Sequence, residues 1–526
     1  MKAKHLVVST ALVLQQLQMS VVPALAEPAQ PGAPAVECDI SQFKPPANTT
    51  ITLVRTFTSP VSYCRVDGFV TTNDPTPNTV NFQISLPDKW NGRYLMYNPG
   101  GGAGFVADPD NNRLTLGYAD ASTDKGSHAP NALNMRFQKY EARHIDFMGR
   151  GLHVTSVATQ EIARAYYARQ KIYRYITGCS GGGVGTLNAA ENYPEDADGF
   201  IPGAFIATPF NTSFFGYIAQ YIYRDPARWL SGDDLKRAGE VIMKEYDDLD
   251  GAHDGLIWDP SRIKLRREMF PFLTAAQYST LEVMQRGLPA PPGMPKQNGF
   301  WLQIGNPGFW VGNPAGFGIP FFGTTPPPWN EKTQPRMFAV PDSWTKGLYG
   351  PQYSLLRDMD YTSPQEMLKE RDMWSRTSGE LDPKNLAKIR KLGGKIVVYF
   401  GSAENAVSPM HGINYQNEAT RLYGPSRQDF LRTFYAPGMY HCAGGEGQPT
   451  DVPAVALDAA VAWVEQGKAP DAIVAHNPQI SRSYLLCPYP RHSKFKGGIT
   501  GMDKQEANNV DGPLDVNDAR NWTCVD

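Results

Sequence analysis

The sequence predicts an α/β fold, in which strands alternate with helices. Two runs of β-branched and aromatic residues, IYRYIT (172–177) and KIVVYF (395–400), each lead into a glycine-containing turn, and a helix-compatible segment follows each turn. A third run, YLMYN (94–98), leads into a glycine-rich loop.

Length and composition favour a compact enzyme over a small binding module. A chain of 526 residues with 41% hydrophobic side chains can bury one large core or two moderate ones. Its 50 basic and 52 acidic side chains nearly balance. This balance gives no indication of nucleic acid or a membrane surface as partner and favours a small neutral or weakly acidic substrate, while the oligomeric state is left open.

The N-terminus, residues 1–26, has the pattern of a secretory signal peptide. Two lysines precede an apolar stretch, and Ala24-Leu25-Ala26 forms a cleavage signature before Glu27. A short buried helix is the alternative. No later run is long and apolar enough to span a bilayer. We therefore expect a soluble mature protein in the periplasm or outside the cell.

Export to an oxidising compartment makes the six cysteines candidates for disulfides. Many pairings are open, and buried free thiols are the alternative. Short loops would be closed at the two ends of the chain, which leaves two cysteines far apart in sequence. The expected pairs are Cys38 with Cys64, Cys487 with Cys524 and Cys179 with Cys442.

Ser180 is the candidate nucleophile. It is the serine of GCSGG (178–182), which matches the G-x-S-x-G pattern, with a strand before it and the helix-compatible GVGTLNAAENYP after it. The glycines permit a sharp turn that exposes the hydroxyl, and the Gly181 N–H would point at the developing oxyanion. Cys179 is the alternative nucleophile, but it could not act as one if its sulfur formed a disulfide.

His441, in APGMYHCAGGEG, is the candidate base. A nucleophile and its base lie within about 3 Å of each other. If Ser180 and His441 do so, their neighbours Cys179 and Cys442 come within disulfide distance. One arrangement then explains both the long-range bridge and the catalytic pair.

The glycine-rich loop of YLMYNPGGGAGF (94–105) is a candidate for the second oxyanion donor. A phosphate cradle is disfavoured, because Phe105 stands where G-x-G-x-x-G requires glycine and no P-loop lysine follows. In the α/β-hydrolase fold this strand-to-helix loop supplies an N–H to the oxyanion hole. We place the donor near Gly101 or Gly102, with a flexible turn as the alternative.

Glu404 is the candidate acid. In the α/β-hydrolase fold the acid lies between serine and histidine in the chain. The segment KIVVYFGSAENAVSP (395–409) begins as a buried strand, breaks at Gly401 and has Glu404 as its first carboxylate. This side chain would accept the Nδ1–H of His441 and stabilise the imidazolium. An exposed loop glutamate is the alternative.

Three motifs, GCSGGGVGTLNAAENYPEDADGFIPGA, GSAENAVSP and GMYHC, together resemble the tannase and feruloyl esterase family. The resemblance extends from about Cys38 to the C-terminus. The family links the residue before the serine to the residue after the histidine, which matches Cys179 and Cys442. The resemblance implies a serine esterase acting on aromatic acid esters, such as gallates, hydroxycinnamates or phthalate-type monoesters, with no cofactor for catalysis.

The segment EYDDLDGAHDGLIWDP (245–260) is similar to the family's calcium loop. The resemblance implies a structural Ca²⁺, and clustered carboxylates between tight turns suit this hard ion. The EF-hand glutamate is absent, and a solvated acidic loop is the alternative. The implied ligands are the carboxylates of Asp247, Asp250 and Asp254 and the carbonyls of Ala252 and Leu256.

Two features depart from the family pattern. Glu404 stands where the family has aspartate. Tyr246 and Ile263 stand where relatives have a disulfide that flanks the calcium loop, and the joint absence of both cysteines is expected for the loss of a whole bridge.

The landmarks divide the chain into a catalytic domain, 27–207 and 390–526, and an inserted lid, 208–389. The lid contains the calcium loop and an aromatic stretch, 298–332, that would partly line an apolar pocket suited to a planar ring. Two other functions stay open: hydrolysis of aliphatic esters or amides, and non-catalytic binding of aromatic acids on the same fold.

Overall fold

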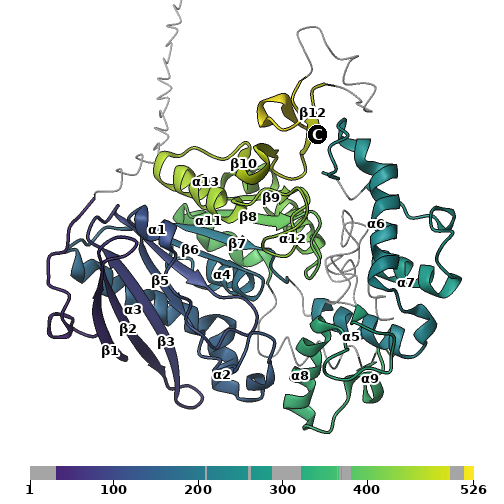
Figure 1. Cartoon of the computed structure of the whole chain (residues 1–526). Helices are drawn as coiled ribbons and strands as arrows, with labels where there is room; N and C mark the ends of the chain where they lie inside the picture. Colours follow the sequence, from purple (N-terminus) through teal and green to yellow (C-terminus); the bar gives the residue numbers. More distant parts are fainter. Residues whose placement is uncertain are drawn as a thin grey trace, which may run out of the picture.

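A nine-stranded mixed sheet occupies the centre of the described part of the protein (Figure 1). The order across it is β1-β2-β3-β5-β4-β6-β7-β8-β9. The first four strands pair antiparallel, and every pair from β5 to β9 is parallel. The strands are β1 (Thr49–Phe57), β2 (Tyr63–Thr72), β3 (Asn78–Pro87), β4 (Arg93–Asn98), β5 (Ala119–Thr123), β6 (Tyr173–Cys179), β7 (Gly199–Gly203), β8 (Lys395–Gly401) and β9 (Leu431–Ala436).

The computed structural model describes most of the chain. The signal-peptide prediction and residues 298–321 of the aromatic stretch lie outside the described residues. The described residues are 31–207, 210–258, 262–286, 322–363, 365–366, 369, 381–497 and 514–526.

Helices cover both faces of the sheet, which is why the parallel strands are buried on both sides. In β8, Ile396, Val398 and Phe400 face one core, and Val397 and Tyr399 face the other. Helices α3, α4 and α12 pack on the first face, and α13 packs on the second. Their bounds are α3 (Gly151–Tyr166), α4 (Gly181–Asn192), α12 (Met410–Tyr423) and α13 (Val452–Gln466).

Smaller elements complete the sheet-bearing part. Two hairpins, β10-β11 and β12-β13, pack beside α13 on the second face. The bounds are α1 (Asn111–Thr115), α2 (Glu141–Ile145), α11 (Ala387–Leu392), β10 (Ile473–Asn477), β11 (Arg482–Leu486), β12 (His492–Phe495) and β13 (Trp522–Val525).

A helical lid lies beside the sheet, on the right in Figure 1. It has a hydrophobic core of its own, built from residues between Phe214 and Tyr361. Phe322, from the described end of the aromatic stretch, is buried there. The helices are α5 (Phe210–Tyr223), α6 (Gly232–Tyr246), α7 (Ala275–Arg286), α8 (Ala339–Tyr349) and α9 (Leu355–Asp358).

The end of the lid differs in packing from the boundary expected at residue 389. Leu381, Leu386 and Ile389 are buried in the core of the first sheet face, not in the lid core. The chain therefore returns to the sheet before α11 begins. The sequence could not place this return, because it depends on contacts with distant strands.

Three disulfides are present in the described residues, with the expected pairings: Cys38–Cys64, Cys179–Cys442 and Cys487–Cys524. In the same residues, every helix is too short or too polar to cross a bilayer.

Candidate active site

Ser180 sits in a strained turn between β6 and α4. Its φ of 61° and ψ of −126° lie in a region that non-glycine residues rarely adopt. The flanking glycines are required by close packing, because a Cβ on Gly178 or Gly182 would lie 2.5 or 2.0 Å from the carbonyl oxygen of Asn98. The turn therefore has the geometry of a nucleophile elbow.

Asn98, the last residue of β4, holds this turn. Its side chain is fully buried, and Nδ2 donates a hydrogen bond of 2.8 Å to the carbonyl oxygen of Gly182. Asn98 was not predicted from the sequence as part of the site. The only signal was its position at the end of a strand, next to the glycine-rich loop.

The Cys179–Cys442 disulfide brings the serine and histidine segments together. The two Cα atoms lie 5.9 Å apart, although 263 positions separate the residues in the chain. Ser180 and His441 accordingly line one cavity.

His441 and Glu404 are in contact. Nδ1 of His441 lies 2.8 Å from Oε1 of Glu404, without the N–H alignment of a full hydrogen bond. Catalytic hydrogen bonds commonly become linear only when substrate binds. Glu404 is fully buried, and Oε1 also accepts from the backbone N–H groups of Ala406 and Val407, at 3.0 and 3.1 Å. The interpretation of Glu404 as an exposed loop residue is wrong.

The loop after β8 also positions the histidine backbone. Asn405 accepts a hydrogen bond of 3.2 Å from the His441 N–H through Oδ1, and the Ala403 N–H donates to the Met439 carbonyl at 3.2 Å. Asn405 was not singled out from the sequence, where it is only a polar neighbour of Glu404.

The expected oxyanion donor Gly102 needs correction. Its N–H already donates to the carbonyl oxygen of Ala132 at 2.8 Å, and it does not line the cavity. Gly101 does line the cavity, and its backbone packs directly on Gly181: a Cβ on Gly181 would lie 3.0 Å from the Gly101 nitrogen. Gly101, the alternative considered from the sequence, is the better candidate.

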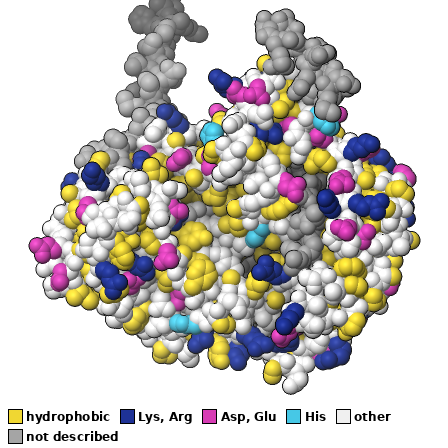
Figure 2. All heavy atoms as spheres, viewed as in Figure 1, with side chains coloured by type: hydrophobic (Ala, Val, Ile, Leu, Met, Phe, Trp, Pro, Cys, Tyr) yellow, Lys and Arg dark blue, Asp and Glu magenta, His cyan; other side chains and the backbone are white. Residues whose placement is uncertain are grey.

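The cavity at Ser180 is mostly apolar and has a volume of about 390 Å³. Phe215, Met337 and Val340 of the lid form part of its wall. Figure 2 shows hydrophobic side chains around the hollow between the two parts of the molecule, while charges of both signs are scattered over this face. Lys125 also lines the cavity and was missed from the sequence.

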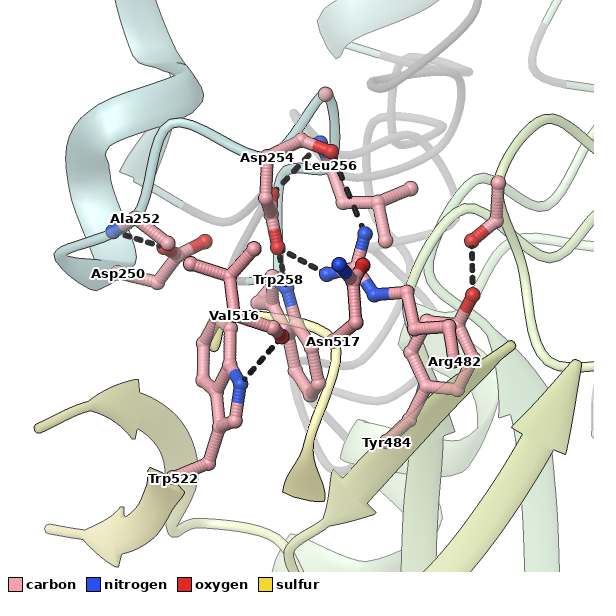
Figure 3. A network of polar contacts seen from close by, with 12 residues as sticks. Asp250, Ala252, Asp254, Leu256, Trp258, Arg482, Tyr484, Val516, Asn517 and Trp522 are labelled. Carbon is pink, nitrogen blue, oxygen red and sulfur yellow. Dashed lines mark hydrogen bonds and ion pairs between the residues drawn. The ribbon is translucent and has the colours of Figure 1, made fainter. Parts of the chain in front are cut away.

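The segment 247–258, here called the aspartate loop, follows α6 and contacts Arg482 of β11 (Figure 3). None of its residues lines the Ser180 cavity. Asp254 accepts hydrogen bonds from the Leu256 N–H, from the Trp258 indole and from the guanidinium of Arg482. The side chains of Asp254 and Arg482 are buried, so this ion pair joins the loop to β11. No pattern in the sequence pointed to Arg482 as the partner of Asp254, because the two residues are 228 positions apart.

Calcium fits this loop only in part. Asp247 and Asp250 are buried, and burial together with the Asp254 carboxylate raises the pKa of Asp250 to about 8. Oδ2 of Asp250 is buried without a hydrogen bond of normal geometry, as expected of a cation ligand. Against this, the described residues contain no group of three or more Asp, Glu, His or Cys side chains arranged around a metal position.

A protein-family model matches most of the chain. The family model described as tannase and feruloyl esterase matches residues 64–282 and 356–509. The chain belongs to the tannase and feruloyl esterase family. It is therefore a carboxylic ester hydrolase.

Curated members of the tannase and feruloyl esterase family match along most of the chain. A probable feruloyl esterase from Arthroderma benhamiae is 26% identical over 467 residues, which cover 82% of each protein. Feruloyl esterase B from Aspergillus niger is 25% identical over 503 residues, covering 88% of this chain and 87% of the relative.

Solved structures of the family share the fold. Feruloyl esterase B from Aspergillus oryzae superposes with a TM-score of 0.74 at 22% identity, covering 93% of this chain and 99% of that one. Tannin acyl hydrolase from Aspergillus niger gives 0.69 at 15% identity, covering 90% and 97%. The predicted α/β-hydrolase fold is confirmed. The catalytic roles of Ser180, His441 and Glu404 stay a prediction.

Proposed function

We propose that this member of the tannase and feruloyl esterase family hydrolyses esters of aromatic carboxylic acids through an acyl-enzyme on Ser180. The observation that carries the proposal is the apolar cavity that a strained serine and a histidine both line, with the histidine Nδ1 2.8 Å from a buried carboxylate.

The chemistry follows from these positions. His441 takes the proton of the Ser180 hydroxyl as the oxygen attacks the ester carbonyl, and a tetrahedral intermediate forms. His441 then gives that proton to the leaving alcohol. Water, activated by the same imidazole, attacks the acyl-enzyme, and the acid leaves as Ser180 regains its proton.

Two groups support the histidine and the intermediate. Glu404 holds the imidazole orientation and stabilises the imidazolium; its buried position strengthens this interaction. The N–H groups of Gly181 and Gly101 would stabilise the oxyanion, because both residues line the cavity at the serine.

The acyl group is expected to be aromatic. The wall contains Phe147, Phe215 and Met337, which suit a planar ring. The printed names of the relatives, feruloyl esterase and tannin acyl hydrolase, point the same way. Gallates, hydroxycinnamates and phthalate-type monoesters are the substrate classes to test.

A structural Ca²⁺ at the aspartate loop is part of the proposal. Asp247, Asp250 and the carbonyls of Ala252 and Leu256 would hold it, and Asp254 would be shared with Arg482. The unsatisfied Oδ2 of Asp250 supports a cation there. When bound, the ion would neutralise the carboxylates and stiffen the loop.

Export is also part of the proposal, with cleavage near Ala26 and Glu27. Three disulfides in the described residues suit an oxidising compartment such as the periplasm or the extracellular space. Mass measurement of the mature N-terminus would test it.

The test of the function is labelling of the protein with a fluorophosphonate, followed by peptide mapping and hydrolysis assays. We expect an adduct on Ser180, none in Ser180→Ala, and faster hydrolysis of methyl ferulate and methyl gallate than of methyl butyrate. Faster hydrolysis of methyl butyrate would favour the alternative hypothesis that the protein hydrolyses aliphatic esters. An unlabelled protein that binds ferulate would be a binding protein on this fold.

A further inference from the structure

Lys125 is a buried lysine in the wall of the Ser180 cavity, and the mechanism above does not use it. It lies two residues beyond the end of β5 at Thr123, and it is only 1% exposed. Nζ donates a hydrogen bond of 2.9 Å to the carbonyl oxygen of Gly181 and lies 4.1 Å from the centre of the Phe147 ring. The ammonium therefore lies beside the residue that follows the candidate nucleophile.

The ammonium has no carboxylate partner among the described residues. Asp124, its neighbour in the chain, accepts from Asn81 and from the Gly126 N–H. Asp146, next to Phe147, accepts from Thr72, Asn78 and Arg150. The other titratable side chains that line the cavity are Tyr97 and His441.

A buried cation without a counter-ion is unfavourable, and burial lowers the pKa of Lys125 to about 7. An ammonium has three N–H donors, of which the Gly181 carbonyl takes one. An anion that entered the cavity would accept from the others and restore the charge balance. Such charge-assisted hydrogen bonds are strong in an apolar site.

We propose that Lys125 recognises a carboxylate that the substrate carries in addition to its scissile ester. The inference rests on the proposed function and narrows its substrate class to acidic esters. Two kinds of ester share this chemistry: monoesters of aromatic dicarboxylic acids, with the carboxylate on the acyl side, and esters that join an aromatic acid to the hydroxyl of a hydroxy acid, with the carboxylate on the alcohol side. No covalent step at Lys125 is involved.

The experiment compares acidic esters with neutral esters of the same shape. The acyl-side pairs are the monomethyl esters of terephthalate and isophthalate against their methyl carbamoylbenzoates. The alcohol-side pair is carboxymethyl benzoate against carbamoylmethyl benzoate. At pH 6, we expect the wild type to favour the acidic member of one pair by about tenfold or more in kcat/KM.

The variant Lys125→Met keeps the length and apolar stem of the side chain and removes its charge. We expect a loss of about 10- to 100-fold in kcat/KM for the preferred acidic ester and less than about threefold for its neutral counterpart. Lys139→Met, which removes an exposed lysine that lies over the Tyr140 ring, is the matched control and should change neither.

The pH dependence in the wild type provides a second readout that requires no variant. Protonated Lys125 dominates below its pKa of about 7, so the ratio of acidic to neutral kcat/KM should fall as pH rises through about 7. Any pH dependence of the catalytic steps that the two esters share cancels in this ratio. In Lys125→Met the ratio should be flat.

The outcomes separate the two hypotheses. Equal losses for acidic and neutral esters in Lys125→Met would mean that Lys125 only supports the Gly181 turn, and the proposal would be wrong. A wild type that is labelled at Ser180 but shows a flat ratio near unity for every pair would also overturn it, while the proposed function stands. Absence of labelling and of all ester hydrolysis would overturn the proposed function itself.

Discussion

The cavity at Ser180 and the aspartate loop both contain buried charged groups, but their charge balance is opposite. At the cavity, His441 has a carboxylate partner, and no carboxylate among the described residues pairs with Lys125. At the loop, Asp247, Asp250 and Asp254 bring three carboxylates together, of which Asp254 pairs with the Arg482 guanidinium, and Oδ2 of Asp250 lacks a normal hydrogen bond. This difference underlies the two proposals, an acidic substrate at the first site and a cation at the second.

Removal of the nucleophile should lower the activity more than any other change considered. Replacement of Ser180 by alanine should lower kcat for methyl ferulate by about 10⁴-fold or more, because no other group can form the acyl-enzyme. Purified protein and stopped-flow or discontinuous assays would measure this. A residual rate within tenfold of wild type would mean that ester hydrolysis does not require Ser180.

The second effect tests the acid. Glu404→Gln should lower kcat by about 10³- to 10⁴-fold, since the imidazole loses its negative partner and its preferred tautomer. The melting temperature should be measured in parallel.

Glu404→Asp is the matched control, because the carboxylate and its charge are kept. It should retain far more activity than Glu404→Gln. Equal activity in the two variants would mean that Glu404 is not the acid of the catalytic triad.

The third effect tests the link between the serine and histidine segments. Replacing Cys179 and Cys442 together by serine should lower the free energy of unfolding by about 4 kcal/mol, because this bridge closes a long loop in the unfolded chain. Urea unfolding would measure it. The pair Cys487 and Cys524, 37 positions apart, is the control and should have a smaller effect.

The smallest effect tests the aspartate loop. Ca²⁺ added to chelator-treated protein should raise stability by about 2.7 kcal/mol at roughly one hundred times its Kd, seen as a higher melting temperature. In Asp250→Asn the response should disappear. Asp248→Asn, which changes a half-exposed neighbour outside the expected ligand set, should keep it. Identical melting curves with and without Ca²⁺ would mean that Ca²⁺ does not stabilise this loop and that Arg482 is the cation that does.

Short-range patterns were sufficient to predict part of the molecule. The strand, G-x-S-x-G turn and helix around Ser180 could be predicted because their residues are adjacent in the chain. The contact with Asn98 that requires glycine at 178 and 182 became evident only in the fold. The disulfide pairings followed from chain order and from the motifs at Ser180 and His441.

Contacts between segments far apart in the chain depend on the fold. Gly102 is not available as an oxyanion donor because its N–H donates to the Ala132 carbonyl. Lys125 lines the cavity because its Nζ reaches the carbonyl of Gly181, 56 positions away, and Asp254 meets Arg482 because β11 packs on the loop. Hydrogen bonding and desolvation depend on neighbours in space, so no local pattern in the sequence could reveal these contacts.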